Sequence, residues 1–199
     1  MQKPSNYDNI STSDYVPVAP GGHKAVIKQV METASKTGNQ MLVISFDFDA
    51  ADTQPAYFMS QYLVDKAANR ENLKWRGTQY LMVDDRTDYG PSNLKRFNEA
   101  VEKSNPGFQV VWGNGYADCF KGKKVGIVFR QEEYVKQDGN TAMASKPFKF
   151  CDFEKALEQN VPAPKMLEKG QNSAPYTEAA NAGFMQVPDA LADEGLPFM

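Results

Sequence analysis

Two stretches of the chain alternate apolar and polar residues, and each is divided by a glycine-containing turn. Residues 23–34 and 41–49 flank a Lys-Thr-Gly-Asn turn, and residues 124–135 and 143–153 flank an Asp-Gly dipeptide. A period of two is typical of half-buried strands, and short turns of this kind join antiparallel neighbours. The alternation of the first strand loses register near Gln29, which predicts a β-bulge there. The sequence therefore predicts two antiparallel hairpins.

The segment between the hairpins carries one clear helix and two further strand candidates. Residues 94–103 place apolar side chains at helical spacing and are followed by Asn-Pro-Gly, which predicts a helix that ends there. Residues 57–64 are aromatic and apolar, and they predict a third strand. Residues 78–83 predict a short fourth one.

These elements predict an all-β domain over residues 15–165. The expected architecture is a five-stranded antiparallel barrel with one helix between the third and fourth principal strands. That is the outline of an OB-fold, a small and partly open barrel. A split β-sandwich is the alternative that the pattern leaves open.

The chain has 199 residues, enough for one domain of ordinary size and an appendage. Its mean hydropathy of -0.56 is low for a chain that is folded throughout. From residue 171 onward the composition is dominated by small and polar residues and proline, which bury too little apolar area to offset the entropy lost on ordering. The sequence therefore predicts a disordered, acidic C-terminal tail over residues 166–199 and a flexible N-terminus over residues 1–14.

The formal net charge of -3 hides an uneven distribution. Residues 171–199 contain four acids and no lysine or arginine, whereas residues 121–150 contain seven cations and three acids. A basic segment combined with an acidic appendage indicates binding to a polyanion. A solvated hairpin of ordinary lysine content is the alternative that charge alone leaves open.

Several classes of site are disfavoured by composition. The single histidine, His23, argues against histidine-rich metal centres and Ser-His-Asp triads, and the two cysteines lie 32 residues apart, which is no metal-ligand spacing. No phosphate-cradling loop followed by Lys-Ser/Thr is present. No apolar run reaches the roughly 18 residues of a membrane span, and the N-terminus lacks the pattern of a signal peptide. We therefore expect a cytoplasmic protein without enzymatic activity, cofactor or membrane association.

The last nine residues read Leu-Ala-Asp-Glu-Gly-Leu-Pro-Phe-Met. They resemble the C-terminal tip of bacterial-type single-stranded DNA-binding proteins, in which acids precede an aliphatic residue, proline and phenylalanine. The resemblance implies that the tip docks onto replication or recombination proteins. The family pattern ends at the phenylalanine, whereas Met199 follows it here, which would weaken a docking mode that needs the terminal carboxylate on that phenylalanine. The predicted partner-binding residues are Asp193, Glu194, Leu196, Pro197 and Phe198.

Four segments of the body, residues 15–22, 95–107, 120–134 and 146–151, resemble a family of small phage proteins that bind single-stranded DNA or act in replication and recombination. The resemblance covers most of the predicted domain. It implies a non-enzymatic protein that coats single-stranded DNA in the cytoplasm of the host cell. Whether the protein is a monomer or a homodimer is left open.

Binding a single strand requires cations for the phosphates and aromatic side chains for the exposed base faces, and stacking contributes about 1–3 kcal/mol per base. The basic hairpin and the loop around Trp75 both interleave these residue types. Trp75 folding back against the barrel is the open alternative for that loop. The predicted nucleic-acid-binding residues are Lys74, Trp75, Arg76, Lys121, Lys123, Lys124, Arg130, Tyr134, Lys136, Lys146 and Lys149.

The remaining aromatic residues are assigned by alternation and context. Phe148 and Phe150 alternate with Lys149 and are expected in the core, as is Trp112. His23 is expected to be an exposed strand residue.

Clustered aspartates support a rival hypothesis, a small metal-dependent nuclease, because paired carboxylates can hold Mg²⁺. Such acids are more often a solubilising edge that prevents strand addition. The aspartates in question are Asp47, Asp49, Asp52, Asp84, Asp85 and Asp88.

Overall fold

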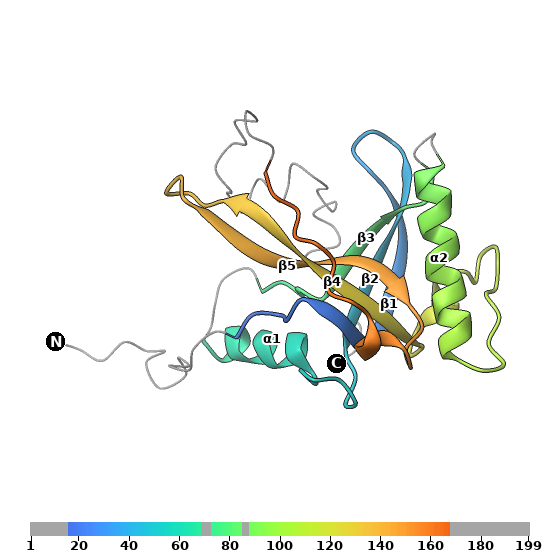
Figure 1. The fold of residues 1–199 in the computed structure, drawn as a ribbon. Coiled ribbons are helices and arrows are strands. Elements are labelled where there is room, and N and C mark those ends of the chain that lie inside the picture. Colours follow the sequence, from blue (N-terminus) through green and yellow to red (C-terminus); the bar gives the residue numbers. More distant parts are fainter. Residues whose placement is uncertain (1–15, 69–72, 85–87, 168–199) are drawn as a thin grey trace.

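The computed structural model of the chain describes residues 16–68, 73–84 and 88–167 (Figure 1). The predicted N-terminus and all but the first two residues of the predicted tail lie outside these ranges. The described part is mainly β, with five strands and two α-helices. Within it, neither helix has both the length and the apolar character needed to span a membrane.

One antiparallel sheet contains all five strands, in the order β3-β2-β1-β4-β5. Three strands that follow one another along the chain are thus adjacent, and the fourth returns to lie beside the first, which is a Greek-key order. The prediction of a five-stranded antiparallel sheet is confirmed, but the described strands do not close a barrel. The strands are β1 (Gly21–Ala34), β2 (Gln40–Phe48), β3 (Thr78–Met82), β4 (Lys124–Val135) and β5 (Thr141–Cys151).

Both predicted hairpins are present, β1 with β2 and β4 with β5. The predicted bulge in β1 is confirmed as well, because the pairing with β2 shifts between Ile27 and Gln29. The sequence does not predict a second register shift, which lies in the pairing of β4 with β5.

The prediction of a strand over residues 57–64 is wrong, because this segment lies in helix α1 (Tyr57–Ala67). The cause is a contact with a residue of another element. The buried Asp47 carboxylate on β2 accepts hydrogen bonds from the backbone N–H groups of Phe58 and Met59, at 3.0 and 3.2 Å. These N–H groups have no partner inside the helix, so a carboxylate stabilises its first turn. The third strand is instead β3, which the sequence predicts as a short fourth one.

The predicted helix between the third and fourth strands is confirmed as α2 (Tyr89–Ser104). It contacts β3, β4 and β5, so it lies across the opening between the two edge strands (Figure 1). The core is largely aromatic and includes the fully buried Phe97 of this helix together with Phe46, Phe120 and Phe129.

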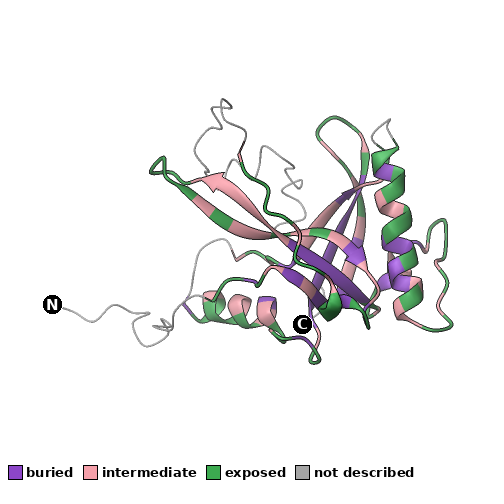
Figure 2. Ribbon diagram, viewed as in Figure 1, coloured by how far each residue is buried: buried purple, intermediate pink, exposed green. Residues whose placement is uncertain are grey.

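The opposite face of β1 and β4 is covered by the chain that follows β5, including the short 3-10 helix η3 (Ala156–Glu158). The approach is so close that a Cβ atom at Gly22 would lie 1.7 Å from the carbonyl oxygen of Ala156, and one at Gly126 would lie 2.7 Å from that of Asp152. The inner halves of these strands are therefore buried on both faces. The outer half of the β4–β5 hairpin extends beyond this covering and is exposed or half-buried (Figure 2).

The prediction that His23 is exposed is wrong. Its ring is buried and stacks on Phe48 with 4.3 Å between ring centroids. Nδ1 lies 3.0 Å from a carboxylate oxygen of Asp52, and Nε2 lies 2.9 Å from the carbonyl oxygen of Ala19. His23 thereby ties the segment before β1 to the turn after β2.

The buried Asp52 carboxylate yields a pH-dependent prediction. Burial raises its pKa, but hydrogen bonds from His23 and from the backbone N–H groups of Gln54 and Lys24 outweigh burial, so the pKa of Asp52 is lowered overall. A carboxyl group with a lowered folded pKa stabilises the fold above its unfolded pKa, near 3.9, and loses that contribution as the pH falls through the folded value.

We therefore expect Asp52→Asn to lower the free energy of unfolding by about 3 kcal/mol at pH 7 and by much less at pH 2. Urea denaturation at both pH values measures this difference. Asp49→Asn is the matched control, since the side chain of Asp49, in the same turn, accepts an exposed hydrogen bond from the backbone N–H of Ala51. An equal loss for Asp52→Asn at the two pH values would contradict the prediction.

Candidate nucleic-acid interface

The outer half of the β4–β5 hairpin begins where β4 leaves the core. Phe129 is 1% exposed and belongs to the core, and the next residue, Arg130, is only half-buried. Val128 pairs with Lys149 but Phe129 pairs with Pro147. One residue of β5, Phe148, therefore has no partner in β4 and forms a bulge.

The bulge changes which side chains share a face. Beyond it, Lys146 pairs with Arg130 and Ser145 pairs with Gln131, so Lys146 projects to the same side as Arg130. Phe148 itself lies on that side, in contact with Arg130, and is 40% exposed. The prediction that Phe148 lies in the core is wrong, whereas Phe150 is buried as predicted.

We call the resulting surface the hairpin face. Alternation along β4 also brings Tyr134 to it, and Lys149 reaches it as the partner of Val128. Lys136 follows in the exposed turn between the two strands. The hairpin face consists of Arg130, Glu132, Tyr134, Lys146, Phe148 and Lys149.

Electrostatic contacts on the hairpin face centre on Glu132. Nη2 of Arg130 donates to one carboxylate oxygen of Glu132 at 2.6 Å, and Nζ of Lys146 lies 3.8 Å from the other. The guanidinium of Arg130 also lies 4.3 Å from the centroid of the Phe148 ring, a cation–π contact. One acid thus holds two cations in place beside an aromatic ring. The Lys146 side chain remains 47% exposed.

A further cation joins the edge of this surface. Past Phe129, β1 no longer pairs with β4, and the segment around Lys165 takes the free edge. Lys165 N–H donates to the carbonyl oxygen of Gln131, and Glu133 N–H donates to that of Lys165, both at 2.9 Å. Lys165 is exposed and, as the bridge partner of Glu132, lies on the same side as the hairpin face. Only its charge could have indicated it from sequence.

The structure does not bring the other three predicted lysines of this segment to the hairpin face. Lys121, Lys123 and Lys124 lie at the opposite end of β4, about 35 Å from its outer end at the usual rise of a strand. There Nζ of Lys123 lies 4.6 Å from the Phe108 ring centroid, and Nζ of Lys124 lies 4.8 Å from that of Phe153.

The predicted loop residues are divided between the interior and the surface. The Trp75 ring packs against the core and contacts the rings of Phe58 and Tyr62, and its Nε1–H donates to the carbonyl oxygen of Gly77. Trp75 is therefore folded back against the body, which is the alternative that the sequence left open for this loop. Lys74 and Arg76, on either side of it, are exposed.

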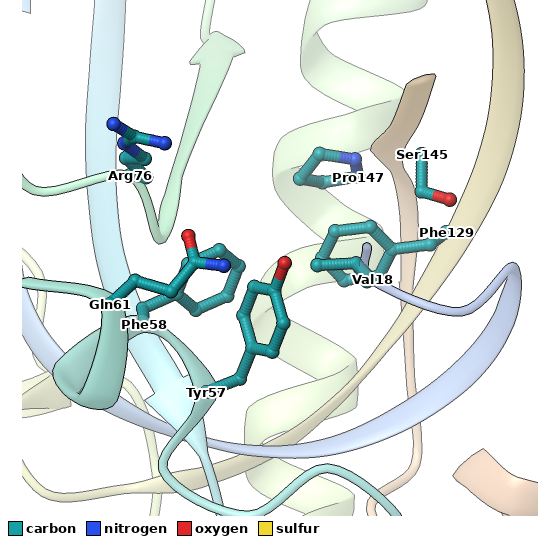
Figure 3. A pocket seen from close by; sticks show the side chains of 8 residues that line it. All are labelled: Val18, Tyr57, Phe58, Gln61, Arg76, Phe129, Ser145 and Pro147. Carbon is teal, nitrogen blue, oxygen red and sulfur yellow. The ribbon is translucent and has the colours of Figure 1, made fainter. Parts of the chain in front are cut away.

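Arg76 lies at a small pocket that joins its loop to the hairpin (Figure 3). The pocket has a volume of about 160 Å³ and lies between α1 and the side of the hairpin opposite the hairpin face. The structure thus brings the two predicted binding segments together here, as separate walls of one cavity. Its lining residues are Val18, Tyr57, Phe58, Gln61, Arg76, Phe129, Ser145 and Pro147.

Two of the aspartates proposed as metal ligands have structural partners. The Asp47 carboxylate accepts hydrogen bonds from α1, and that of Asp52 accepts them from His23 and the backbone. Asp88 is the N-cap residue of α2, and Asp85 lies outside the described residues. In the described ranges, no group of three or more acidic, histidine or cysteine side chains is placed to hold a metal ion.

One aromatic residue that the sequence analysis assigns to the core is on the surface. Trp112 is 68% exposed, so that prediction is wrong. Its ring stacks on Tyr116 with 5.1 Å between centroids, and Tyr116 is anchored by a hydrogen bond from its hydroxyl to Asn98 at 2.7 Å. Burial raises the pKa of the Tyr116 hydroxyl. The neighbouring Val110 and Val111 gave a core-like signal, although Val111 is exposed as well.

Comparisons with known proteins give no relative from which a site could be transferred: no family model matches the chain, and the search of curated proteins finds no match.

The two tryptophans provide a direct test of these positions. We expect acrylamide to quench mainly the emission of the exposed Trp112, because the Trp75 ring is packed between α1 and the core. Trp112→Phe should therefore remove most of the quencher-accessible fluorescence, and Trp75→Phe should retain it. Equal quenching of the two single-tryptophan variants, both folded by circular dichroism, would contradict this arrangement.

Proposed function

We propose that this protein is a non-enzymatic, sequence-nonspecific single-stranded DNA-binding protein of phage replication and recombination, acting in the cytoplasm of the host cell. The observation that carries the proposal is the hairpin face, on which two aromatic rings and three cations lie on one side of a two-stranded ribbon. Cations track the phosphates of a single strand, and aromatic rings stack on its bases without regard to sequence. The resemblance of the sequence to small phage proteins of this kind agrees with the proposal.

The fold we propose for the body is an OB-fold. The Greek-key strand order supports it, as does the position of α2 between β3 and β4 across the gap between the edge strands. In this architecture a helix that covers the opening protects both exposed sheet edges from pairing with other chains.

Binding on the hairpin face would exchange one set of charge contacts for another. Without a ligand, Glu132 pairs with both Arg130 and Lys146 and offsets one of their two positive charges. A phosphate offers the same acceptor chemistry, and its binding releases counterions from the nucleic acid, which favours association at low salt. Phe148 is positioned beside the same guanidinium, so a base stacking on its ring would place the adjacent phosphate near Arg130.

The C-terminal tip is proposed to recruit other proteins of DNA replication or recombination through the residues named above, which lie outside the described part of the chain. The last described residue, Leu167, still contacts the body, because its N–H donates to the Glu133 carboxylate at 3.1 Å.

The rival function, a metal-dependent nuclease, is supported less well because Asp47 and Asp52 have other partners. Burial raises the pKa of Asp47, although backbone N–H groups of α1 partly offset this effect. A carboxylate that is buried and bonded to a helix terminus is poorly placed to bind a cation. A binding function accounts for the hairpin face without requiring these acids.

The charge contacts on the hairpin face can be tested by substituting both of its Glu132-bound cations. We expect Arg130→Gln with Lys146→Gln to weaken binding to a labelled oligo-dT by about one to two orders of magnitude at low salt. The slope of log affinity against log salt should fall by about 1.4, because each lost phosphate contact removes about 0.7 for a single strand. Fluorescence anisotropy over a salt series measures both quantities.

The control for this pair is Lys95→Gln with Lys103→Gln, which removes the same charge from α2, where both side chains are exposed and bound to one acid, Glu99. It should leave the salt slope nearly unchanged. Equal effects of the two double variants would show that only net charge matters and would refute the proposed interface.

Glu132→Gln should act in the opposite direction. The substitution preserves the shape of the side chain but removes the charge that competes with phosphate for Arg130 and Lys146. We expect about two- to tenfold tighter binding at low salt and a smaller gain at high salt. The same anisotropy titration measures it, and weaker binding by a folded Glu132→Gln protein would contradict the exchange of contacts.

A further inference from the structure

We propose that the pocket between α1 and the β4–β5 hairpin accepts a single unstacked nucleobase of the bound strand. This inference rests on the proposed function and adds to it a site of defined size and chemistry. The pocket lies behind the hairpin face, and no predicted binding residue except Arg76 lines it.

The walls of the pocket suit a flat aromatic ring. Tyr57, Phe58 and Phe129 contribute aromatic surface, and Val18 and Pro147 contribute aliphatic surface. In Figure 3, Tyr57 and Gln61 reach from α1 toward the middle of the group, with Pro147 and Ser145 on the other side. A volume of about 160 Å³ equals roughly five water molecules at 30 Å³ each, which suits one base and falls short of the usual size of pockets for drug-sized ligands.

The polar groups of the pocket are available to a ligand. Within the described residues, neither the side-chain amide of Gln61 nor the hydroxyl of Ser145 makes a hydrogen bond with the protein. An amide and a hydroxyl can each donate and accept, so they can bond the edges of different bases. The Arg76 side chain is 51% exposed and pairs with Asp65 at 3.1 Å, which leaves further guanidinium N–H groups for a phosphate at the mouth of the pocket.

A strand held on the hairpin face can reach the pocket across the edge of β5. No described strand pairs with that edge. Lys146 lies on the hairpin face, whereas its neighbours Ser145 and Pro147 line the pocket on the other side. A backbone that passes from Lys146 over this edge therefore carries its next base toward the pocket and its next phosphate toward Arg76. Charge complementarity on both sides of the edge thus favours a nucleic-acid strand as the occupant.

The experiment compares oligo-dT with an oligonucleotide of the same length made entirely of abasic sites, both labelled, by anisotropy. The backbone charge of the two is equal, so the ratio of their affinities reports contacts to bases. We expect Ser145→Phe, which fills the pocket, to weaken oligo-dT binding about tenfold, as loss of one stacked base would. Binding of the abasic strand should stay within about twofold of the parent.

Thr141→Phe is the matched control, because Thr141 lies on the same strand and the same side as Ser145 but is exposed near the hairpin turn, outside the pocket. It should change neither affinity by more than about twofold. Gln61→Leu, which keeps the volume of the α1 wall but removes its amide, gives a second reading and decides the question if Ser145→Phe does not fold. We expect it to weaken oligo-dT binding several-fold and to spare the abasic strand.

The inference is overturned if folded Ser145→Phe and Gln61→Leu bind oligo-dT as tightly as the parent chain, or if they weaken the two oligonucleotides equally. Either result leaves the proposed function intact, provided that the Arg130 and Lys146 substitutions still weaken both oligonucleotides. Failure of the parent protein to bind either oligonucleotide would instead refute the proposed function itself.

Discussion

The bulge at Phe148 determines the chemistry of the outer hairpin. Because side chains on a strand alternate between two faces, one extra residue reverses the face of every residue beyond it. With regular pairing, Lys146 would lie opposite Gln131, on the side of the pocket, and Ser145 would lie opposite Glu132. The observed shift instead pairs Lys146 with Arg130 and turns Ser145 toward α1. The bulge therefore places the cations of the hairpin face and the largely apolar pocket on opposite sides of the hairpin.

The long strand β4 serves two purposes along its length. Its inner half is buried on both faces, by the aromatic core on one side and by the chain around η3 on the other. This burial fixes the register of β4 with β1, and the pairing of β4 with β5 continues into the outer half, which neither layer covers. The hairpin face, which the proposed ligand must reach from solvent, is thus held in place by the buried inner half of β4. The loop residue Arg76 gains its position in the same way, because Trp75 beside it is packed against α1.

The sequence predicts those elements whose cause is local. Alternation and turn residues suffice for both hairpins and for the bulge in β1, and helical spacing suffices for α2. Helix α1 could not be predicted, because its first turn depends on the carboxylate of Asp47 from another element and its apolar residues also suit a strand. The predictions for His23 and Trp112 were wrong for a related reason. The His23 ring is buried because Asp52 and Ala19 provide polar partners for it. The Trp112 ring is exposed on one side and stacks on Tyr116 with the other. At the site, the basic and aromatic residue types indicated the β4–β5 hairpin. Only the register shift shows which of these side chains lie on the same face.

The acid at the centre of the hairpin face resolves an apparent conflict in the proposal. A surface made to attract phosphates would seem to need free cations, yet Arg130 and Lys146 are both bound to Glu132. Like charges held together without a counter-ion repel one another, and long cationic side chains without partners sample many rotamers. Glu132 reduces the repulsion and orders both side chains before a ligand arrives, at the expense of some affinity. The pair between Lys146 and Glu132 is long, at 3.8 Å, and its lysine is half-exposed; ion pairs of this kind are weak, so a phosphate can replace the carboxylate there. The acid therefore favours a preorganised surface that binds reversibly, as the proposed coating and release of a single strand would require.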